Sequence, residues 1–139
     1  MATVARASAV PVGADEGIHG RAEVLAHARE RAAAGVSLKP CKAGGVAEVV
    51  RLAAVADALG LSVHVASLIE SSVATAAVLA VGCAASRLDW GISLTNHCLA
   101  EDLVAAPLAL DRSGAICPPA ASGLGVAVDE AQVERFRIR

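Results

Sequence analysis

The chain has 139 residues, of which 55% are hydrophobic and 19% are charged, and its formal net charge is −2. This length is typical of one compact domain, and the high apolar content excludes a disordered chain. The 12 lysines and arginines are outnumbered by 14 aspartates and glutamates, which excludes a nucleic-acid binder that works by bulk positive charge. The longest weakly polar run, residues 71–86, is shorter than the roughly 20 apolar residues of a membrane span, so we expect no membrane partner.

The cysteines indicate a reducing compartment. Cys41, Cys83, Cys98 and Cys117 form no CxxC pair and no Cys/His cluster with the spacing of a zinc site. Residues 1–14 contain no long apolar stretch with a cleavage site, so no signal peptide is predicted. We therefore expect four reduced thiols and a cytoplasmic location.

Short β-rich runs alternate with alanine-rich helical runs. Apolar runs bounded by turn residues predict strands, and a 3.6-residue periodicity predicts helices. In chain order, we predict a strand at 9–14, a helix at 21–33, a strand at 36–40, a helix at 46–59, a strand at 61–66, a helix at 71–85 and a very short strand at 88–90. After Gly91 the pattern is lost, and a proline- and glycine-rich tail leads to a charged segment at 129–139.

The repeat of a strand and a helix predicts an α/β fold with a parallel sheet and right-handed crossovers. Two architectures fit this repeat: an open doubly wound sheet and an arc of a (β/α) barrel. A closed eight-stranded barrel needs about 250 residues, so the chain holds roughly half of one, with about three βα units, a short last strand and a tail. The predicted organisation is a lead-in at 1–8, a partial barrel domain at 9–128 and a charged tail segment at 129–139.

Polar side chains gather at the carboxyl ends of the predicted strands, where both architectures place their chemistry. Alternation along the second strand places Ser37 and Lys39 on one face, so that Lys39 points into the mouth of a barrel. Taken singly, an acidic residue there is usually a helix cap or a loop residue, and a lysine among apolar residues usually extends to solvent. Their repetition on one rim instead indicates a site, whose members are Asp15, Glu16, Lys39, Ser67, Glu70 and Asp89.

These residue types predict a metal-assisted proton transfer. A carboxylate at the rim can bind a hard cation such as Mg²⁺. Burial and neighbouring positive charge lower the pKa of a lysine, so Lys39 can serve as a general base near neutral pH. The metal would stabilise the negative charge that develops when a proton leaves the carbon beside a carboxylate. No GxGxxG or Walker-type glycine motif points to phosphate binding instead.

Four ordered motifs carry these residues, at 10–16, 37–45, 67–72 and 123–126. With these motifs and the spacing from Asp15 to Lys39, the sequence resembles the enolase superfamily, in its muconate-lactonizing and mandelate racemase-like branch of cycloisomerases, dipeptide epimerases and N-acylamino acid racemases. The resemblance implies a (β/α)₇β barrel of the TIM type preceded by an α+β capping domain. This chain matches the C-terminal part of that barrel.

The resemblance also implies roles for the charged residues. Asp15 matches a metal-binding acid on the fifth barrel strand, with Glu16 as its secondary neighbour. Lys39 matches the acid/base lysine of the sixth strand and is the expected catalytic residue. Lys42, one turn further on, is expected to lie in a loop.

The expected substrate-binding residues follow the next two strands. Ser67 and Glu70 match the segment that lines the substrate pocket. Asp89 matches an aspartate that holds the substrate ammonium in dipeptide epimerases, but Gly91 stands where those enzymes have a second aspartate. This departure leaves cycloisomerase and N-acylamino acid racemase chemistry at least as compatible as dipeptide epimerisation.

The family's capping domain, its lysine pair on the second strand and its first two metal acids find no match in this sequence. We therefore expect a C-terminal fragment of an isomerase that depends on Mg²⁺ or Mn²⁺ and removes a proton alpha to a carboxylate of a small substrate. The expected partners are an N-terminal half or further copies of the chain. One alternative is a non-catalytic remnant or association module that completes a barrel, and another is an unrelated doubly wound binding protein.

Overall fold

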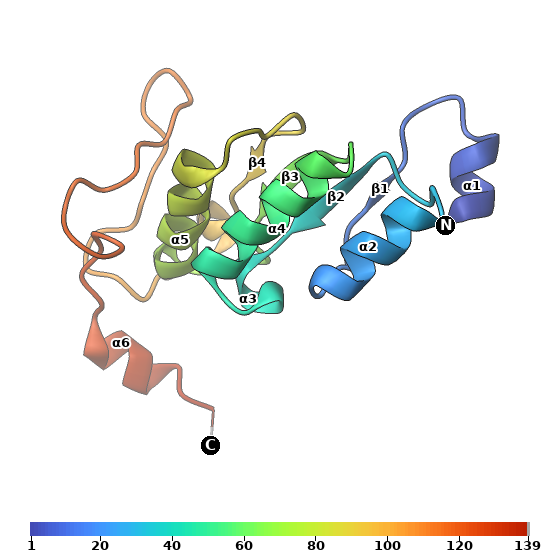
Figure 1. Ribbon diagram of the computed structural model, residues 1–139. Helices are drawn as coiled ribbons and strands as arrows, with labels where there is room; N and C mark the ends of the chain where they lie inside the picture. Colours follow the sequence, from blue (N-terminus) through green and yellow to red (C-terminus); the bar gives the residue numbers. More distant parts are fainter. Residues whose placement is uncertain (139) are drawn as a thin grey trace.

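The computed structural model describes residues 1–138 and contains a four-stranded sheet with helices packed against one face (Figure 1). Its elements, in chain order, are α1 (Ala2–Ala7), β1 (Gly13–Ala14), α2 (Arg21–Arg29), β2 (Gly35–Leu38), α3 (Pro40–Ala43), α4 (Val46–Ala58), β3 (Ser62–Ala66), α5 (Ser72–Ala84), β4 (Ile92–Ser93), the 3₁₀ helix η1 (Asn96–Cys98) and α6 (Glu130–Arg135).

The strands lie in the order β1-β2-β3-β4, and every neighbouring pair is parallel. β2 and β3 share the longest register, from Gly35 opposite Ser62 to Leu38 opposite Val65. β1 and β4 are the outer strands of the described sheet, and each pairs over two residues. The carboxyl ends of all four strands therefore lie along one edge, which confirms the predicted parallel α/β arrangement.

Side-chain alternation separates the two faces of the sheet. Val36 and Leu38 of β2 and Val63 and Val65 of β3 are at most 1% exposed and belong to a core shared with α2, α4 and α5. The opposite face, which we call the inner face, carries polar side chains. Because these three helices cover a single face (Figure 1), the arrangement is that of a barrel arc and the doubly wound alternative is wrong.

Several element boundaries differ from the prediction. The helix predicted at 21–33 ends at Arg29, because Arg31 has a φ of 48° in the left-handed region, which a helix does not continue through. The strand predicted at 9–14 is limited to Gly13–Ala14. The short helix α3 was not predicted, and Pro40 stands at its first position. Lys42 is thus helical, and the expectation that it lies in a loop is wrong.

The strand predicted at 88–90 is wrong as well. The amide of Gly91 donates to the carbonyl oxygen of Leu88 at 3.1 Å, which closes a turn, and Gly91 has a φ of 75°. The last strand follows this turn as β4, at Ile92–Ser93. Trp90 lies two residues before the start of β4, and Asp89 therefore precedes the strand instead of lying within it.

The indole of Trp90 lies over the amino ends of β1 and β2 on the inner face. A Cβ atom built on Gly13 or on Gly35 would come within 2.7 Å of the Trp90 ring. Real Cβ contacts are not this close, so glycine at both positions permits the approach of the ring.

The tail after β4 is tied to the start of α5. The amide of Ser72 donates to both carboxylate oxygens of Asp102 at 3.0 Å, and the Ser72 hydroxyl donates to Asp102 at 2.7 Å. An acid at a helix N-terminus satisfies free amides and is favoured by the helix dipole. Within residues 1–138, no helix has the length and apolarity needed to cross a membrane.

Candidate functional site

The structure brings Asp15, Glu16 and Lys39 together at the carboxyl edge of the sheet. Asp15 follows β1 and Lys39 follows β2, and these strands are adjacent and parallel. The ammonium group of Lys39 donates to Asp15 Oδ1 and to Glu16 Oε1. The Lys39 side chain is 4% exposed, whereas those of Asp15 and Glu16 are 57% and 66% exposed. The cluster thus consists of a buried cation covered by two solvent-facing carboxylates.

Lys42 completes the cluster from α3. Its ammonium group donates to the main-chain carbonyl oxygen of Glu16 and, at 3.0 Å, to Glu16 Oε2. Glu16 therefore lies between two lysines, and this position fixes its carboxylate.

These contacts set the protonation states of the cluster. The hydrogen bonds from Lys39 and then Lys42 lower the pKa of Glu16, so this carboxylate is ionised. Burial is the largest single influence on Lys39 and by itself lowers its pKa. The hydrogen bonds to Asp15 and Glu16, together with the negative charges of these carboxylates, outweigh burial, and the pKa of Lys39 is raised. The expectation that the pKa of Lys39 is lowered is wrong for this arrangement, because the carboxylates stabilise the charged ammonium.

Ser67 follows β3 and is 5% exposed. Its hydroxyl lies 2.9 Å from the hydroxyl oxygen of Thr95, and Thr95 in turn donates to the carbonyl oxygen of Leu68. The carboxyl ends of β3 and β4 are therefore joined by hydroxyl groups. Ser67 belongs to the same sheet edge as Lys39, as the strand order requires.

Glu70 lies further along the same edge, near the start of α5. Its carboxylate accepts a hydrogen bond from the amide of Leu68 at 2.7 Å. Burial, followed by the negative charge of Glu70, raises the pKa of the Cys41 thiol, which places Glu70 beside the residue two positions after Lys39. The segments after β2 and β3 thus meet.

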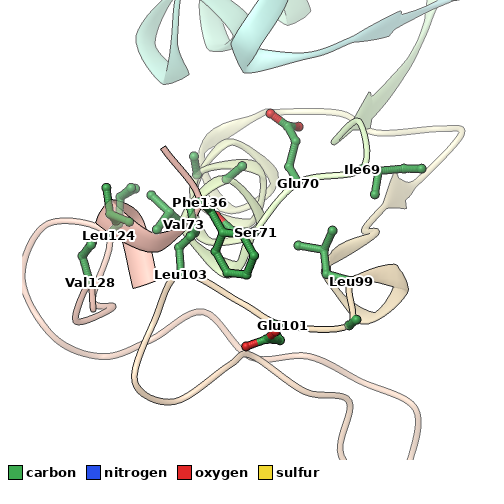
Figure 2. A pocket seen from close by; sticks show the side chains of 14 residues that line it. Ile69, Glu70, Ser71, Val73, Leu99, Glu101, Leu103, Leu124, Val128 and Phe136 are labelled. Atoms are coloured by element: carbon green, nitrogen blue, oxygen red, sulfur yellow. The ribbon is translucent and has the colours of Figure 1, made fainter. Parts of the chain in front are cut away.

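Glu70 also borders a cavity of about 820 Å³ between α5 and the C-terminal tail. Most of its lining is apolar, and the Glu70 carboxylate at its edge is directed away from the apolar side chains (Figure 2). This cavity is lined by neither Asp15 nor Lys39, so it lies beside the charged cluster and is separate from it.

Asp89 lies at the opposite edge of the sheet from Lys39. The guanidinium group of Arg87 donates to Asp89 at 2.6 Å and to Asp57 near the end of α4 at 3.2 Å. The neighbouring Trp90 amide donates to Val63 at the amino end of β3. The structure therefore does not bring Asp89 to the other predicted site residues, because the strand assignment on which its placement depended was wrong.

Three polar side chains of the inner face were missed: His64 on β3, Ser93 on β4 and Thr95 after it. Alternation in Ser62–Ala66 places His64 on the face opposite Val63 and Val65, and this signal is visible in the sequence. The same alternation puts Ser93 and Thr95 on one face, but it was hidden by the misplaced fourth strand. The rim positions after β4 thus carry hydroxyls, where an aspartate was expected.

The described residues provide only part of a divalent-metal site. Asp15 and Glu16 offer exposed carboxylate oxygens of the kind that Mg²⁺ prefers. However, residues 1–138 contain no group of three or more His, Cys, Asp or Glu side chains arranged to hold a metal ion. The ion also needs near-octahedral coordination, so this donor set fits as a contribution to a site and does not form a complete one.

The comparison with known proteins identifies the family. A family model described as "Enolase C-terminal domain-like" matches residues 1–132. The chain belongs to this family. The geometry agrees, because the parallel arc, with an acid after β1 and a lysine after β2, has the order that the sequence motifs implied.

Several proteins to which this chain is similar are cycloisomerases. Muconate cycloisomerase 1 of Rhodococcus opacus is 35% identical over 127 residues, which cover 91% of this chain and 34% of that protein. A chloromuconate cycloisomerase of Cupriavidus pinatubonensis is 34% identical and is covered to 37%. The crystal structure of a muconate lactonizing enzyme from Pseudomonas fluorescens, complexed with muconolactone, matches with a TM-score of 0.90 and 30% identity over 99% of this chain and 37% of that one. The chain thus spans about a third of the length of its curated relatives and matches their C-terminal barrel portion.

Proposed function

We propose that this chain forms the C-terminal barrel portion of a divalent-metal-dependent isomerase that removes a proton from the carbon next to a carboxylate. The observation that carries the proposal is the Asp15–Glu16–Lys39 cluster at the carboxyl edge of a family-typical sheet. The relatives favour cycloisomerisation of a small dicarboxylate such as muconate. Racemisation and epimerisation, which belong to other isomerases of this superfamily, are the alternatives.

In this proposal, Lys39 is the catalytic acid or base. As an ammonium group, it can deliver a proton to a carbanion or hold a substrate carboxylate by charge. To act as a base, Lys39 must lose its proton. This becomes easier when Asp15 and Glu16 bind another cation, because burial then lowers the pKa of the lysine without the opposing effect of the two carboxylates. The cluster therefore links the protonation of Lys39 to the occupancy of its carboxylates.

Asp15, with Glu16 beside it, is the proposed contribution of this chain to a Mg²⁺ or Mn²⁺ site. The remaining oxygen ligands must come from other parts of the enzyme or from substrate, since the described residues lack them. A bound divalent ion supplies stabilisation of negative charge on a substrate carboxylate.

Ser67 and Glu70 are the proposed substrate-binding residues. Both follow β3 at the edge that holds Lys39, and Ser67 is fixed by Thr95. The described residues at the carboxyl end of β4, Ser93 and Thr95, carry hydroxyls and offer no carboxylate to bind a substrate ammonium group. This favours a substrate that has no ammonium group at the end facing β4.

Co-expression with the missing part of the barrel tests the proposal. The chain would be produced with the N-terminal two thirds of the Rhodococcus opacus muconate cycloisomerase 1, and consumption of muconate with Mn²⁺ would be followed. We expect activity with incorporation of solvent deuterium at the α-carbon of the product, and Lys39→Ala should abolish both. Arg51→Ala, at an exposed α4 position whose guanidinium group is paired with Glu48, is the matched control and should retain activity. Equal activity of the Lys39→Ala and control complexes would refute the assignment of Lys39.

A second candidate function is that of an association module without activity of its own. It is favoured by the two outer strands, β1 and β4, each of which has a single neighbour in the described sheet and so leaves backbone groups available for pairing. This module would bind an N-terminal half or another copy of the chain. Analytical ultracentrifugation tests the module: a homogeneous monomer that does not bind an N-terminal half would contradict it, whereas a complex without isomerase activity would favour it.

A further inference from the structure

A second group of reactive side chains lies on the inner face, outside the Asp15–Lys39 cluster. Ser37 on β2, His64 on β3 and Ser93 on β4 stand on three neighbouring strands. His64 Nδ1 lies 2.9 Å from Ser37 Oγ, and His64 Nε2 lies 2.9 Å from Ser93 Oγ. Nothing in the proposed isomerase function uses this row, and the inference drawn from it does not depend on that function.

The two hydrogen bonds fix the imidazole ring in one orientation. In the tautomer with its proton on Nδ1, the ring donates to Ser37 Oγ, and the lone pair of Nε2 accepts the hydroxyl proton of Ser93. This is the order of nucleophile, base and orienting group that activates a serine. Burial, the largest influence, lowers the pKa of His64, with Asp15 and Lys39 acting in opposite directions, so the ring is neutral at pH 7 and able to accept a proton.

Exposure determines which serine can react. Ser37 is 8% exposed, and its hydroxyl is engaged by Nδ1 of the ring. Ser93 is exposed on the inner face. Only Ser93 therefore combines an accessible hydroxyl with a neighbouring base. Ser37 is buried and orients that base.

We propose that Ser93 is a nucleophile activated by His64 and oriented through Ser37, and that this row reacts with small carboxylic esters. Ser93 Oγ forms a bond to the ester carbonyl carbon while its proton passes to His64 Nε2. The bond from that carbon to the leaving oxygen then breaks, and the proton passes to the leaving alcohol. Water, deprotonated by His64, attacks the acyl group and releases the acid with Ser93 restored. The balance is one ester and one water converted to one acid and one alcohol.

The experiment uses the full chain in EDTA, with a small alkyl fluorophosphonate as the covalent probe and p-nitrophenyl acetate as the ester. Intact mass and peptide mapping should show one adduct, on Ser93. Ser93→Ala and His64→Gln should each slow labelling at least 100-fold, and Ser37→Ala should slow it about tenfold. Ser86→Ala, an exposed serine of the loop before β4, should label at the normal rate.

Circular dichroism and Trp90 fluorescence establish that each variant is folded. Since Ser93→Ala removes one exposed oxygen, we expect its melting curve to be unchanged, and His64→Gln provides an independent loss of the base. Absence of an adduct on the wild-type chain, an adduct on Ser37, or unchanged labelling of Ser93→Ala would overturn the proposal. Because the assay contains EDTA and measures labelling of Ser93, its failure would leave the isomerase function untouched.

Discussion

The ammonium group of Lys39 is almost fully buried, whereas the carboxylate of Asp15 that accepts its hydrogen bond is more than half exposed. The two members of this ion pair therefore respond differently to removal of their partner. An exposed carboxylate that loses its cation is still hydrated, but a buried ammonium that loses its carboxylates has no replacement for them.

This asymmetry predicts unequal effects of substitution on stability. Lys39→Met keeps the alkyl chain and should change the free energy of unfolding by less than about 1 kcal/mol. The double variant Asp15→Asn/Glu16→Gln should lower it by more, because the buried ammonium then lacks a counter-charge. Urea denaturation followed by circular dichroism measures both. A double variant that is as stable as Lys39→Met would show that Lys39 is not held by these carboxylates.

The same pair predicts weak metal binding by the chain alone. Asp15 and Glu16 are already neutralised by Lys39, and two carboxylates fall short of a complete ligand set. Mn²⁺ should therefore bind with a dissociation constant on the order of millimolar or weaker.

Lys39→Met should tighten this binding, because it removes the competing cation while leaving both carboxylates in place. Electron paramagnetic resonance of free Mn²⁺ provides the measurement, and Asp15→Asn is the control that should abolish the gain. Tight stoichiometric binding by the wild-type chain would show that further ligands are present.

The charged cluster could be predicted from the sequence because it depends on two robust features. Strand and helix alternation fixes the parallel order, and a parallel order places Asp15 and Lys39 at one edge whatever the exact length of β1. What the sequence could not provide is the protonation state of Lys39. That state depends on contact with two carboxylates, which outweighs burial, and no pattern encodes such a contact.

The position of Asp89 shows the opposite case. Its predicted role depended on a strand of three residues, and short strands carry little periodic signal. The turn closed by Gly91 moves the strand to Ile92–Ser93, and the rim residue changes from an acid to hydroxyls. The strand is held there by pairing with β3 and by the contact of Trp90 with two distant glycines, and both are tertiary effects.

His64 predicts how stability depends on pH. Its pKa in the folded chain is lowered from 6.5, mainly by burial, so the unfolded chain binds more protons than the folded one below pH 6.5. The free energy of unfolding should therefore be constant just above pH 6.5 and should decrease as the pH falls below it. The lowered pKa of Glu16 acts in the same direction but only below its ordinary value of 4.5, which leaves the interval between 4.5 and 6.5 to His64.

Urea denaturation at half-unit pH steps tests this dependence. His64→Gln, which retains hydrogen-bonding groups but does not titrate, should flatten the curve between pH 4.5 and 6.5. His97→Gln, at an exposed position of η1, should retain the wild-type slope. A slope that persists in His64→Gln would assign the dependence to other groups.

The contact between Trp90 and the inner face predicts the effect of a single methyl group. In Gly35→Ala, the new Cβ would lie 2.7 Å from the carbonyl oxygen of Ser62 and 2.7 Å from the indole of Trp90. The Ser62 carbonyl belongs to the neighbouring strand and cannot move without loss of the β2–β3 ladder. The second close contact is relieved only by displacement of the indole. We expect a loss of about 1–3 kcal/mol in the free energy of unfolding, the usual cost of overpacking. Because Trp90 is the single tryptophan of the chain, its fluorescence should shift to longer wavelength as the ring becomes more hydrated.

Gly17→Ala is the matched control, since no atom lies within 4 Å of the added Cβ, and it should leave both stability and fluorescence unchanged. Equal behaviour of the two variants would mean that the ring does not cover β2.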